Sequence, residues 1–193
     1  MVRRVLVLNG HPDPRPERLC AALCDAYVRG AHGAGYEVRR IDIGALDFPL
    51  IRSEAEFVDT TLGREIAEAQ AALAWADHLV LVFPLWLGGV PALTKGFLEQ
   101  VFRYGFALSP PGQPMRGLLT GRSARLIVTM GMPGTVFRVI FGAFGVRWME
   151  RGLLWICGIR PIRRTVFGSV QTAGDAARKA WLARVEALGA TAA

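Results

Sequence analysis

Five short runs of apolar residues alternate with longer segments in which apolar residues recur at helical spacing. The runs lie at residues 2–8, 38–43, 79–83, 124–129 and 162–167 and are rich in Val, Leu and Ile. Runs of this length predict strands, and the continuous apolar ones predict strands buried on both faces. Because a helical segment follows each run, the pattern predicts a parallel sheet with helices on both faces.

Right-handed crossovers leave few topologies for five such units. We expect an α/β fold of the flavodoxin-like type, a doubly wound five-stranded parallel sheet in the order 2-1-3-4-5. No internal repeat, low-complexity segment or linker interrupts residues 1–193, so a single domain is expected.

Turn and capping residues indicate where several helices begin and end. Pro16 fits the first position of the first helix, because that position needs no amide hydrogen, and Gly33 and Gly35 are expected to end this helix. Ser53 stands three residues before a glutamate, which is the spacing of a capping box. Thr172 is a candidate cap for the last helix.

Two long segments do not fit the simple alternation. Residues 136–159 are the most hydrophobic stretch but contain four charged residues, which are costly at the centre of a bilayer, so no membrane span is expected. A buried or dimer-facing helix pair fits better. Residues 104–121 are rich in Pro and Gly, and a loop of this length suggests a functional element such as a lid over a substrate.

The formal net charge of +7 favours an anionic ligand. The arginines are spread out, and the only tight group lies at residues 160–164, so an anionic small molecule is expected rather than nucleic acid. The three cysteines lack zinc spacing and are odd in number, which predicts reduced thiols, with Cys20 and Cys24 on one helix. Met1 leads directly into the first strand with no signal peptide, so a cytoplasmic protein is expected.

Ligands of doubly wound sheets bind at the carboxyl ends of the strands, where the strand order reverses. In the predicted order this point lies between the first and third strands. Three loops should therefore share the site: residues 9–18 (the first loop), 84–91 (the second loop) and 130–134 (the third loop).

The first loop leads into a helix N-terminus, which favours an anion such as a phosphate. His11, Arg15 and Arg18 could add side-chain donors. Glu17 acts in the opposite direction, because it would cap the helix dipole itself and repel a phosphate. The alternative is an ordinary strand-to-helix turn with a surface histidine.

The second and third loops offer glycines and backbone amides. In the second loop Trp86 could cover an aromatic ring, or it could pack in the core under the next helix. A planar heterocycle between these two loops is the natural inference. The common phosphate-binding glycine motifs and the Gly-x-Ser-x-Gly nucleophile motif are missing, and the three histidines form no evident triad or metal cluster. A cofactor that brings its own chemistry is therefore expected, and no metal.

At these loops the sequence resembles the flavodoxin-like NAD(P)H:quinone oxidoreductases, a family that includes flavin-dependent quinone reductases. The most specific similarity is at residues 83–86 (FPLW), with 89–93 (GVPAL) and 95–97 (KGF). Residues 5–12 (VLVLNGHP) and 128–131 (VTMG) add to it. In the order of its elements the resemblance covers almost the whole chain.

The resemblance implies a tightly bound flavin, FAD or FMN, that takes hydride from NAD(P)H and passes it to a quinone or similar small acceptor. It also implies a homodimer with the site at the subunit interface. The flavin phosphate would lie near His11, Arg15, Arg18 and the amide of Glu17. The ring would be framed by Pro84, Leu85, Trp86, Leu87, Thr129, Met130, Gly131 and Met132.

The sequence departs from this family at two places. Pro16, Glu17 and Arg18 stand where many relatives have Ser, Phe and Asn, so a hydroxyl donor is lost. Residues 135–149 lack the Tyr and His that mammalian quinone reductases place near the flavin. No side chain is therefore assigned a catalytic role, and backbone amides, Arg138 or solvent would have to stabilise the reduced, anionic flavin.

Three other functions remain open. The chain could be a flavin-bearing regulatory subunit of a transporter or another protein, docking through residues 136–159. It could be a one-electron carrier like flavodoxin, although those proteins are usually acidic and this chain is basic. It could also process a nucleotide or sugar phosphate without flavin. The excess of arginine favours NADPH as the reductant, because the extra phosphate needs a cation.

Overall fold

The computed structural model describes residues 3–192, which form one five-stranded sheet flanked by helices. The strands are β1 (Arg4–Asn9), β2 (Glu37–Asp42), β3 (His78–Pro84), β4 (Ser123–Thr129) and β5 (Ile162–Phe167). All neighbouring strands pair in parallel, in the order β2-β1-β3-β4-β5. The predicted flavodoxin-like fold and strand order are confirmed.

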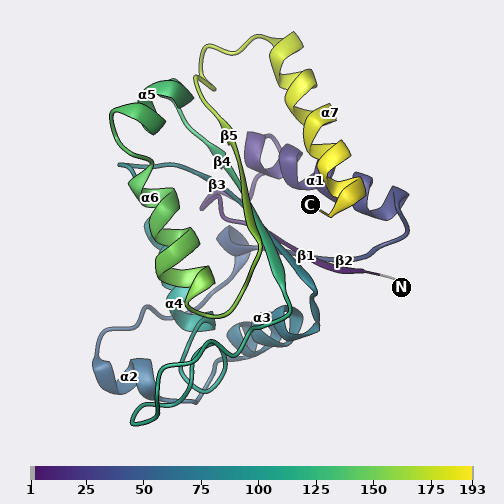
Figure 1. Cartoon of the computed structure of the whole chain (residues 1–193). Coiled ribbons are helices and arrows are strands. Elements are labelled where there is room, and N and C mark those ends of the chain that lie inside the picture. The colour runs from purple at the N-terminus through teal and green to yellow at the C-terminus, as the bar shows by residue number, and fades with distance from the viewer. Residues whose placement is uncertain (1–2, 193) are drawn as a thin grey trace.

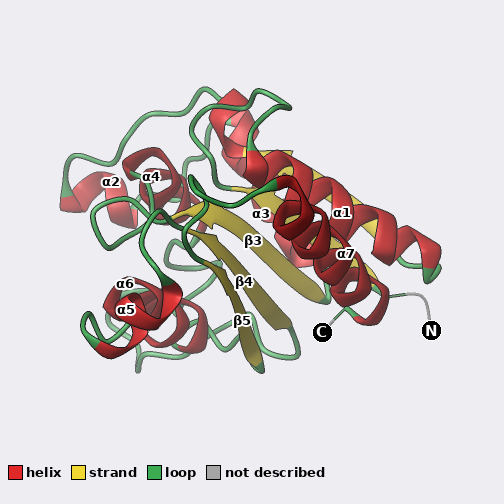
Figure 2. Ribbon diagram, turned by 90° about the horizontal axis from the view of Figure 1, so that it is seen from above, coloured by secondary structure: helices red, strands yellow, loops and turns green. Residues whose placement is uncertain are grey.

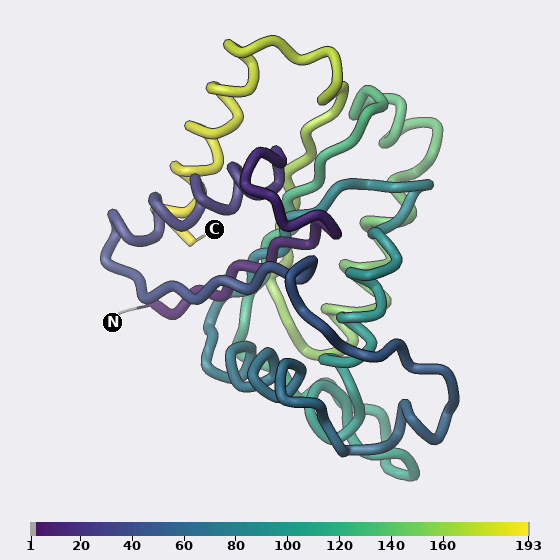
Figure 3. Tube along the Cα trace, turned by 180° about the vertical axis from the view of Figure 1, so that it is seen from behind, coloured from purple at the N-terminus to yellow at the C-terminus, as the bar shows by residue number. Residues whose placement is uncertain are grey.

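Helices cover both faces of the sheet. They are α1 (Leu19–Gly33), α2 (Glu54–Val58), α3 (Arg64–Trp75), α4 (Ala92–Val101), α5 (Gly134–Val139), α6 (Phe144–Arg147) and α7 (Asp175–Thr191), with a 3-10 turn η1 (Ile43–Ala45) and a π-helical segment η2 (Trp148–Trp155). Figure 1 and Figure 2 show α1 and α7 side by side on one face, while α3, α4 and α6 lie on the other. Figure 3 shows the two ends of the chain on the same side of the molecule.

The alternation of side chains along each strand divides the core in two. Val5 and Val7 of β1 pack with residues of α1 and α7, whereas Leu6 and Leu8 face the cluster that includes α3 and α4. β3 is buried along its whole length, as expected for the central strand of a sheet covered on both faces. Among the described residues, no helix is both long and apolar enough to cross a bilayer.

The predicted start of the first helix was wrong by three residues. α1 begins at Leu19, not at Pro16, because Asp13 and the turn that follows it hold the chain in another conformation. The side chain of Asp13 accepts a hydrogen bond from the amide of Arg15 at 3.1 Å, and the amide of Arg18 bonds the carbonyl of Arg15 at 3.2 Å. Arg18 is extended, so the helix starts only after it.

The other helix ends were predicted with mixed success. Gly33 is the last residue of α1 and Gly35 has a φ of +80°, which is the left-handed conformation expected after a helix. Ser53 caps α2 by accepting from the amide of Glu56 at 3.2 Å. Thr172 does not cap the last helix, because its hydroxyl donates to the carbonyl of Ser169 and α7 begins later, at Asp175.

Residues 104–121 do not form a lid over the crevice of their own chain. This loop precedes β4, so it lies at the amino ends of the strands, near α3 (Figure 1). It is held there by hydrogen bonds from Leu119 to the carbonyl of Cys157 and from Leu118 to the carbonyl of Ala107, both at 2.9 Å. The order of the elements places any loop before a parallel strand at this end, away from the ligand-binding edge.

The hydrophobic segment after β4 is only partly buried. It forms α5, α6 and η2 instead of two regular helices. Phe137, Val146 and Met149 are buried, but Ile140 and Phe144 each expose 72% of their surface. The segment therefore covers the sheet with one side and presents an apolar face with the other.

Candidate functional site

The three predicted loops come together at the carboxyl ends of β1, β3 and β4. The amide of Gly10 bonds the carbonyl of Val82 at 2.7 Å, and the hydroxyl of Thr94 donates to the carbonyl of Gly10 at 2.6 Å. These bonds fix the first loop to β3 and α4. The amide of Leu85 donates to the carbonyl of Thr129 at 2.7 Å, which joins the second loop to the start of the third.

His11 lies where the first and second loops meet. Its Nδ1 accepts a hydrogen bond from the amide of Asp13 at 3.0 Å, so the proton of the neutral ring is on Nε2. Burial, and then the charge of Arg18, lower the pKa of His11 below its ordinary value. The ring is therefore neutral at neutral pH and has one N–H that can donate to an anion.

Asp13 holds the two arginines that the sequence suggested for phosphate binding. Its Oδ2 accepts from Nη2 of Arg15 and from Nε of Arg18, both at 2.7 Å. The hydrogen bonds from Arg15, and then those from Arg18, hold the pKa of this carboxyl well below its usual range. The first loop thus already gathers two cations around one anionic group. Sequence reasoning missed Asp13, although an aspartate followed by a proline is a recognisable turn signal.

The N-terminus of α1 is open. Arg18 precedes the helix, its side chain makes no capping hydrogen bond, and no acidic residue lies in the first turn. The predicted role of Glu17 as a cap of the helix dipole is therefore wrong, because Glu17 lies outside the helix and is exposed. A helix of 15 residues with free first-turn amides favours an anion at this end.

The second loop turns sharply and exposes large apolar side chains. Trp86 and Gly89 exchange two backbone hydrogen bonds of 2.9 Å, with Leu87 and Gly88 between them. Leu87 has a φ of +49° and Gly88 a φ of +82°, a turn in which leucine is strained. Trp86 is half exposed and Leu87 fully exposed, so the core-packing alternative for Trp86 is wrong.

The residues that the sequence suggests for the flavin ring are of two kinds. Some are buried and form the floor of the site, and the others are accessible and form its open rim. Pro84, Thr129 and Met130 are buried; the hydroxyl of Thr129 lies 3.5 Å from the thiol of Cys20, and the amide of Met130 bonds the carbonyl of Phe167. These three can support a ligand only from below. The accessible residues are Leu85, Trp86, Leu87, Gly131 and Met132.

These features suit a ligand with an anionic tail and a flat apolar ring. A Cβ atom added at Gly88 or Gly89 would meet nothing within 4 Å, so there is open space beside the second loop. A neutral His11, the open helix end and two arginines lie on the adjoining first loop. A flavin carries both parts, a phosphate and a planar ring, and the residues present fit it.

Arg138 does not lie between these loops. Its side chain lines a separate cavity at the outer edge of β5. The expectation that Arg138 stabilises a reduced flavin is therefore not supported by its position. Among the described residues, no group of three His, Cys, Asp or Glu side chains could hold a metal ion.

An exposed apolar face adjoins the second loop. Gly145 of α6 is in close contact with the carbonyl of Gly88. A Cβ atom added at Gly145 would lie only 1.8 Å from that oxygen. This contact places α6 beside Trp86 and Leu87. The apolar face comprises the exposed side chains of Trp86, Leu87, Val139, Ile140, Phe141, Phe144 and Trp148.

Comparison with known proteins gives consistent results. Residues 3–188 match a family model described as flavodoxin-like fold. The sequence is 30% identical to an uncharacterized NAD(P)H oxidoreductase of Haemophilus influenzae, covering 92% of this chain and 89% of the relative. It is 27% identical to ribosyldihydronicotinamide dehydrogenase (quinone) of Pongo abelii, covering 96% and 92% of the two chains.

A solved structure shows the same fold. It is an FMN-dependent NADH-azoreductase from Bacillus anthracis in complex with FMN, similar with a TM-score of 0.76 over 98% of this chain and 99% of that chain. The two sequences are only 15% identical, so this likeness concerns the fold alone.

Proposed function

The chain belongs to the flavodoxin-like family whose relatives include NAD(P)H and quinone oxidoreductases, and from this premise we propose that it is a flavin-dependent NAD(P)H oxidoreductase acting on a quinone or similar small acceptor. The observation that carries the proposal is the junction of the first and second loops, where donors for a phosphate adjoin an open apolar rim. A bound flavin supplies the chemistry, accepting hydride from the nicotinamide and donating it to the acceptor.

The first loop binds the phosphate. The Nε2–H of His11 and the free amides at the start of α1 donate to the phosphate oxygens. Arg15 and Arg18 contribute positive charge, although Asp13 shares them. Because His11 stays neutral, its contribution is a directed hydrogen bond and not a charge.

The second and third loops orient the ring and exclude water from one of its faces. Trp86 and Leu85 form an apolar wall, and the buried Met130 and Pro84 keep the wall rigid. At the third loop, Gly131 makes room for the side chain of Gln171, whose Oε1 lies 2.7 Å from the position that a Cβ would take. No charged side chain from these two loops enters the site, so an open ring face remains for a nicotinamide or a quinone in turn.

We also propose that the chain forms a homodimer through the apolar face. A monomer would leave seven large apolar side chains in water, next to the site. A second copy of this chain covers them and closes the open side of the crevice. This arrangement gives the apolar segment after β4 its function, in place of docking to a transporter.

The proposal is tested by reconstitution of the purified protein with FMN, FAD and riboflavin, followed by absorbance and fluorescence titration. We expect FMN and FAD to bind more tightly than riboflavin, because riboflavin has no phosphate for the phosphate site. The loaded protein should then turn over NADPH or NADH with a small quinone. Absence of any flavin binding would overturn the proposal, and a bound flavin without turnover would favour the regulatory-subunit alternative.

A further inference from the structure

A cavity lies at the outer edge of β5, between α5 and α7. Its volume is about 530 Å³, which lies within the usual range for small-molecule sites. Its lining comes from the third loop and α5, from β5 and the residues after it, and from Arg184 of α7. Pro133 and Gly134 of the third loop belong to this lining, but none of the residues proposed to hold the flavin does, so the cavity differs from the proposed flavin site.

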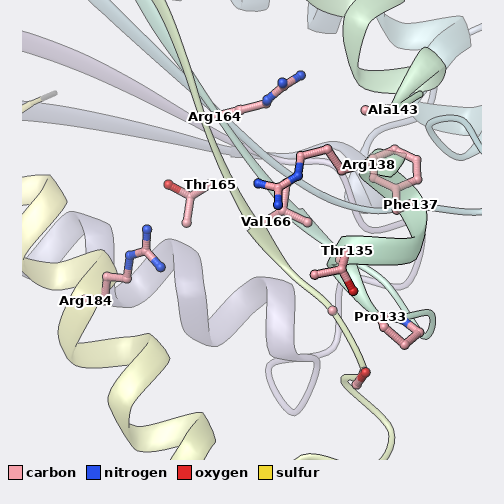
Figure 4. A pocket seen from close by; sticks show the side chains of 12 residues that line it. Pro133, Thr135, Phe137, Arg138, Ala143, Arg164, Thr165, Val166 and Arg184 are labelled. Carbon is pink, nitrogen blue, oxygen red and sulfur yellow. The ribbon is translucent and has the colours of Figure 1, made fainter. Parts of the chain in front are cut away.

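Two guanidinium groups from different elements face this cavity. Figure 4 shows the side chain of Arg138 lying across Val166 and that of Arg184 reaching toward Thr165 from the opposite side. Arg164 also lines the cavity, but its guanidinium points away from these two in Figure 4 and pairs with Glu150 at 3.2 Å. Among the described residues that line the cavity there is no Asp or Glu.

A further arginine lies beneath the cavity. Nη1 of the buried Arg125 donates to the hydroxyl oxygen of Thr165 at 2.7 Å. Because that oxygen is already an acceptor, the hydroxyl hydrogen of Thr165 is directed elsewhere and can serve a ligand. Burial, and then the charges of Arg163 and Arg184, lower the pKa of Arg125 below its ordinary value.

The walls of the cavity are rigid and partly apolar. Gly168 allows β5 and the third loop to touch, since a Cβ there would be 2.4 Å from the amide nitrogen of Gly134. The amide of Ser169 bonds the carbonyl of Met132 at 3.1 Å and holds the same junction. Val166 and Pro133 give the cavity an apolar wall beside the charged groups.

We propose that this cavity is a second ligand site, which binds a small organic phosphate of nucleotide size. The guanidinium groups of Arg138 and Arg184 clamp the phosphate groups from two sides, with the hydroxyl of Thr165 as a further donor. The apolar wall receives the organic part. A bare phosphate would leave most of this volume unfilled, which is why an organic ester is favoured over an inorganic ion.

The test is a calorimetric titration of the flavin-loaded protein with ADP and, separately, with pyrophosphate, at an ionic strength of about 50 mM so that the charges are not screened. We expect ADP to bind more tightly than pyrophosphate. The double variant Arg138→Gln/Arg184→Gln should weaken ADP at least about tenfold, because two charge-assisted bonds are lost. Arg116→Gln, an exposed arginine in the loop at residues 104–121, is the control for general charge and should change the affinity by less than about twofold.

Two further readouts locate the ligand. Amide chemical shifts of Gly134, Thr165 and Ser169 should move on addition of ADP, because these residues line the cavity. The FMN affinity of the double variant should equal that of the unmodified protein. A failure of the proposed ADP site is therefore distinguishable from a failure of the proposed flavin site. The proposal is overturned if ADP does not bind or if pyrophosphate binds as tightly as ADP. It is also overturned if the double variant and the Arg116→Gln control bind ADP with equal affinity.

Discussion

The ring of His11 stands edge-on to the ring of Trp86, with the two centroids 5.9 Å apart and the planes at 82°. One residue belongs to the first loop and the other to the second, so this contact joins the phosphate end of the proposed site to its ring end. A positive ring edge against an aromatic face is a favourable arrangement. The two halves of the site are therefore expected to be coupled, although each can be tested with its own ligand.

Replacement of Trp86 should weaken every flavin, with or without a phosphate. Trp86→Ala removes half-exposed aromatic surface beside the proposed ring, and we expect the affinity for both FMN and riboflavin to fall about tenfold. Trp155→Ala is a matched control, because Trp155 is exposed to a similar extent, 54% against 50%, but belongs to η2. Fluorescence titration measures both. An equal loss in the two variants would contradict the assignment of Trp86.

Replacement of Asp13 should strengthen the binding of FMN and leave riboflavin unchanged. Asp13→Asn removes the carboxylate that holds Arg15 and Arg18, so both guanidinium groups become available to a phosphate. We expect the affinity for FMN to rise about three- to tenfold at low salt, and the gain to shrink as salt is added. The pKa of Asp13 is far below its usual range, so this carboxyl stays ionised near neutral pH. Titration of Asp13 should therefore cause no change in the FMN affinity of the unmodified protein near neutral pH. A weaker FMN complex in the variant would show that Asp13 organises the loop instead of competing with the ligand.

A charge placed on the apolar face should dissociate the proposed dimer. Phe144→Glu puts a carboxylate on this face, and sedimentation velocity should show a shift from dimer to monomer at about 10 µM protein, because a buried unpaired charge is costly. Met115→Glu is the control, since Met115 is exposed to the same 72% but lies in the loop at residues 104–121. A monomer before any substitution would contradict the dimer directly.

The stability of the protein should fall in mild acid because of one buried histidine. His78 is 1% exposed, lies 3.0 Å from the hydroxyl of Tyr27 and 2.7 Å from that of Ser123, and burial is the main reason that its pKa falls to about 3. The unfolded chain binds the proton near pH 6.5, so between about pH 6.5 and 3 it holds more protons than the folded protein. Stability is complete above this window and falls by up to about 1.4 kcal/mol per pH unit within it.

Urea denaturation between pH 5 and 7.5 measures this slope. His78→Gln should remove most of it, since glutamine does not titrate. If that variant does not fold, the titration of the His78 ring in the unmodified protein, followed by NMR, gives the same answer. A ring that becomes protonated near pH 6.5 in the folded state would refute the prediction.

Periodicity and element order were sufficient to predict the sheet. The continuous apolar runs at β1 and β3 could only be central strands, and the alternation with helices then left one common strand order. That order placed the three loops together, so the location of the site followed from topology and not from any single motif. Trp86 was identified as a candidate because it lies in the loop after the third strand, but the sequence alone left open whether it covers a ring or packs in the core.

Local hydrogen bonds could not be predicted in the same way. The start of α1 depends on Asp13, whose side chain competes with the helix for the amides of the first loop. Thr172 matched the composition of a cap, but its hydroxyl donates to the carbonyl of Ser169 instead of accepting from a helix amide, and α7 begins at Asp175. The position of Arg138 depends on the irregular helix α5, whose course no periodic pattern describes. In each case several local conformations suit the same residue types, and the sequence pattern does not distinguish between them.

The strands at the two rims of the sheet carry charge. Arg163 and Arg164 are exposed on β5, and Glu37 is exposed at the start of β2. A neighbouring molecule that added a strand at either edge of the sheet would have to remove the water around these charged side chains. Self-association by strand addition is thereby disfavoured, and concentrated solutions of this protein should resist the formation of fibres.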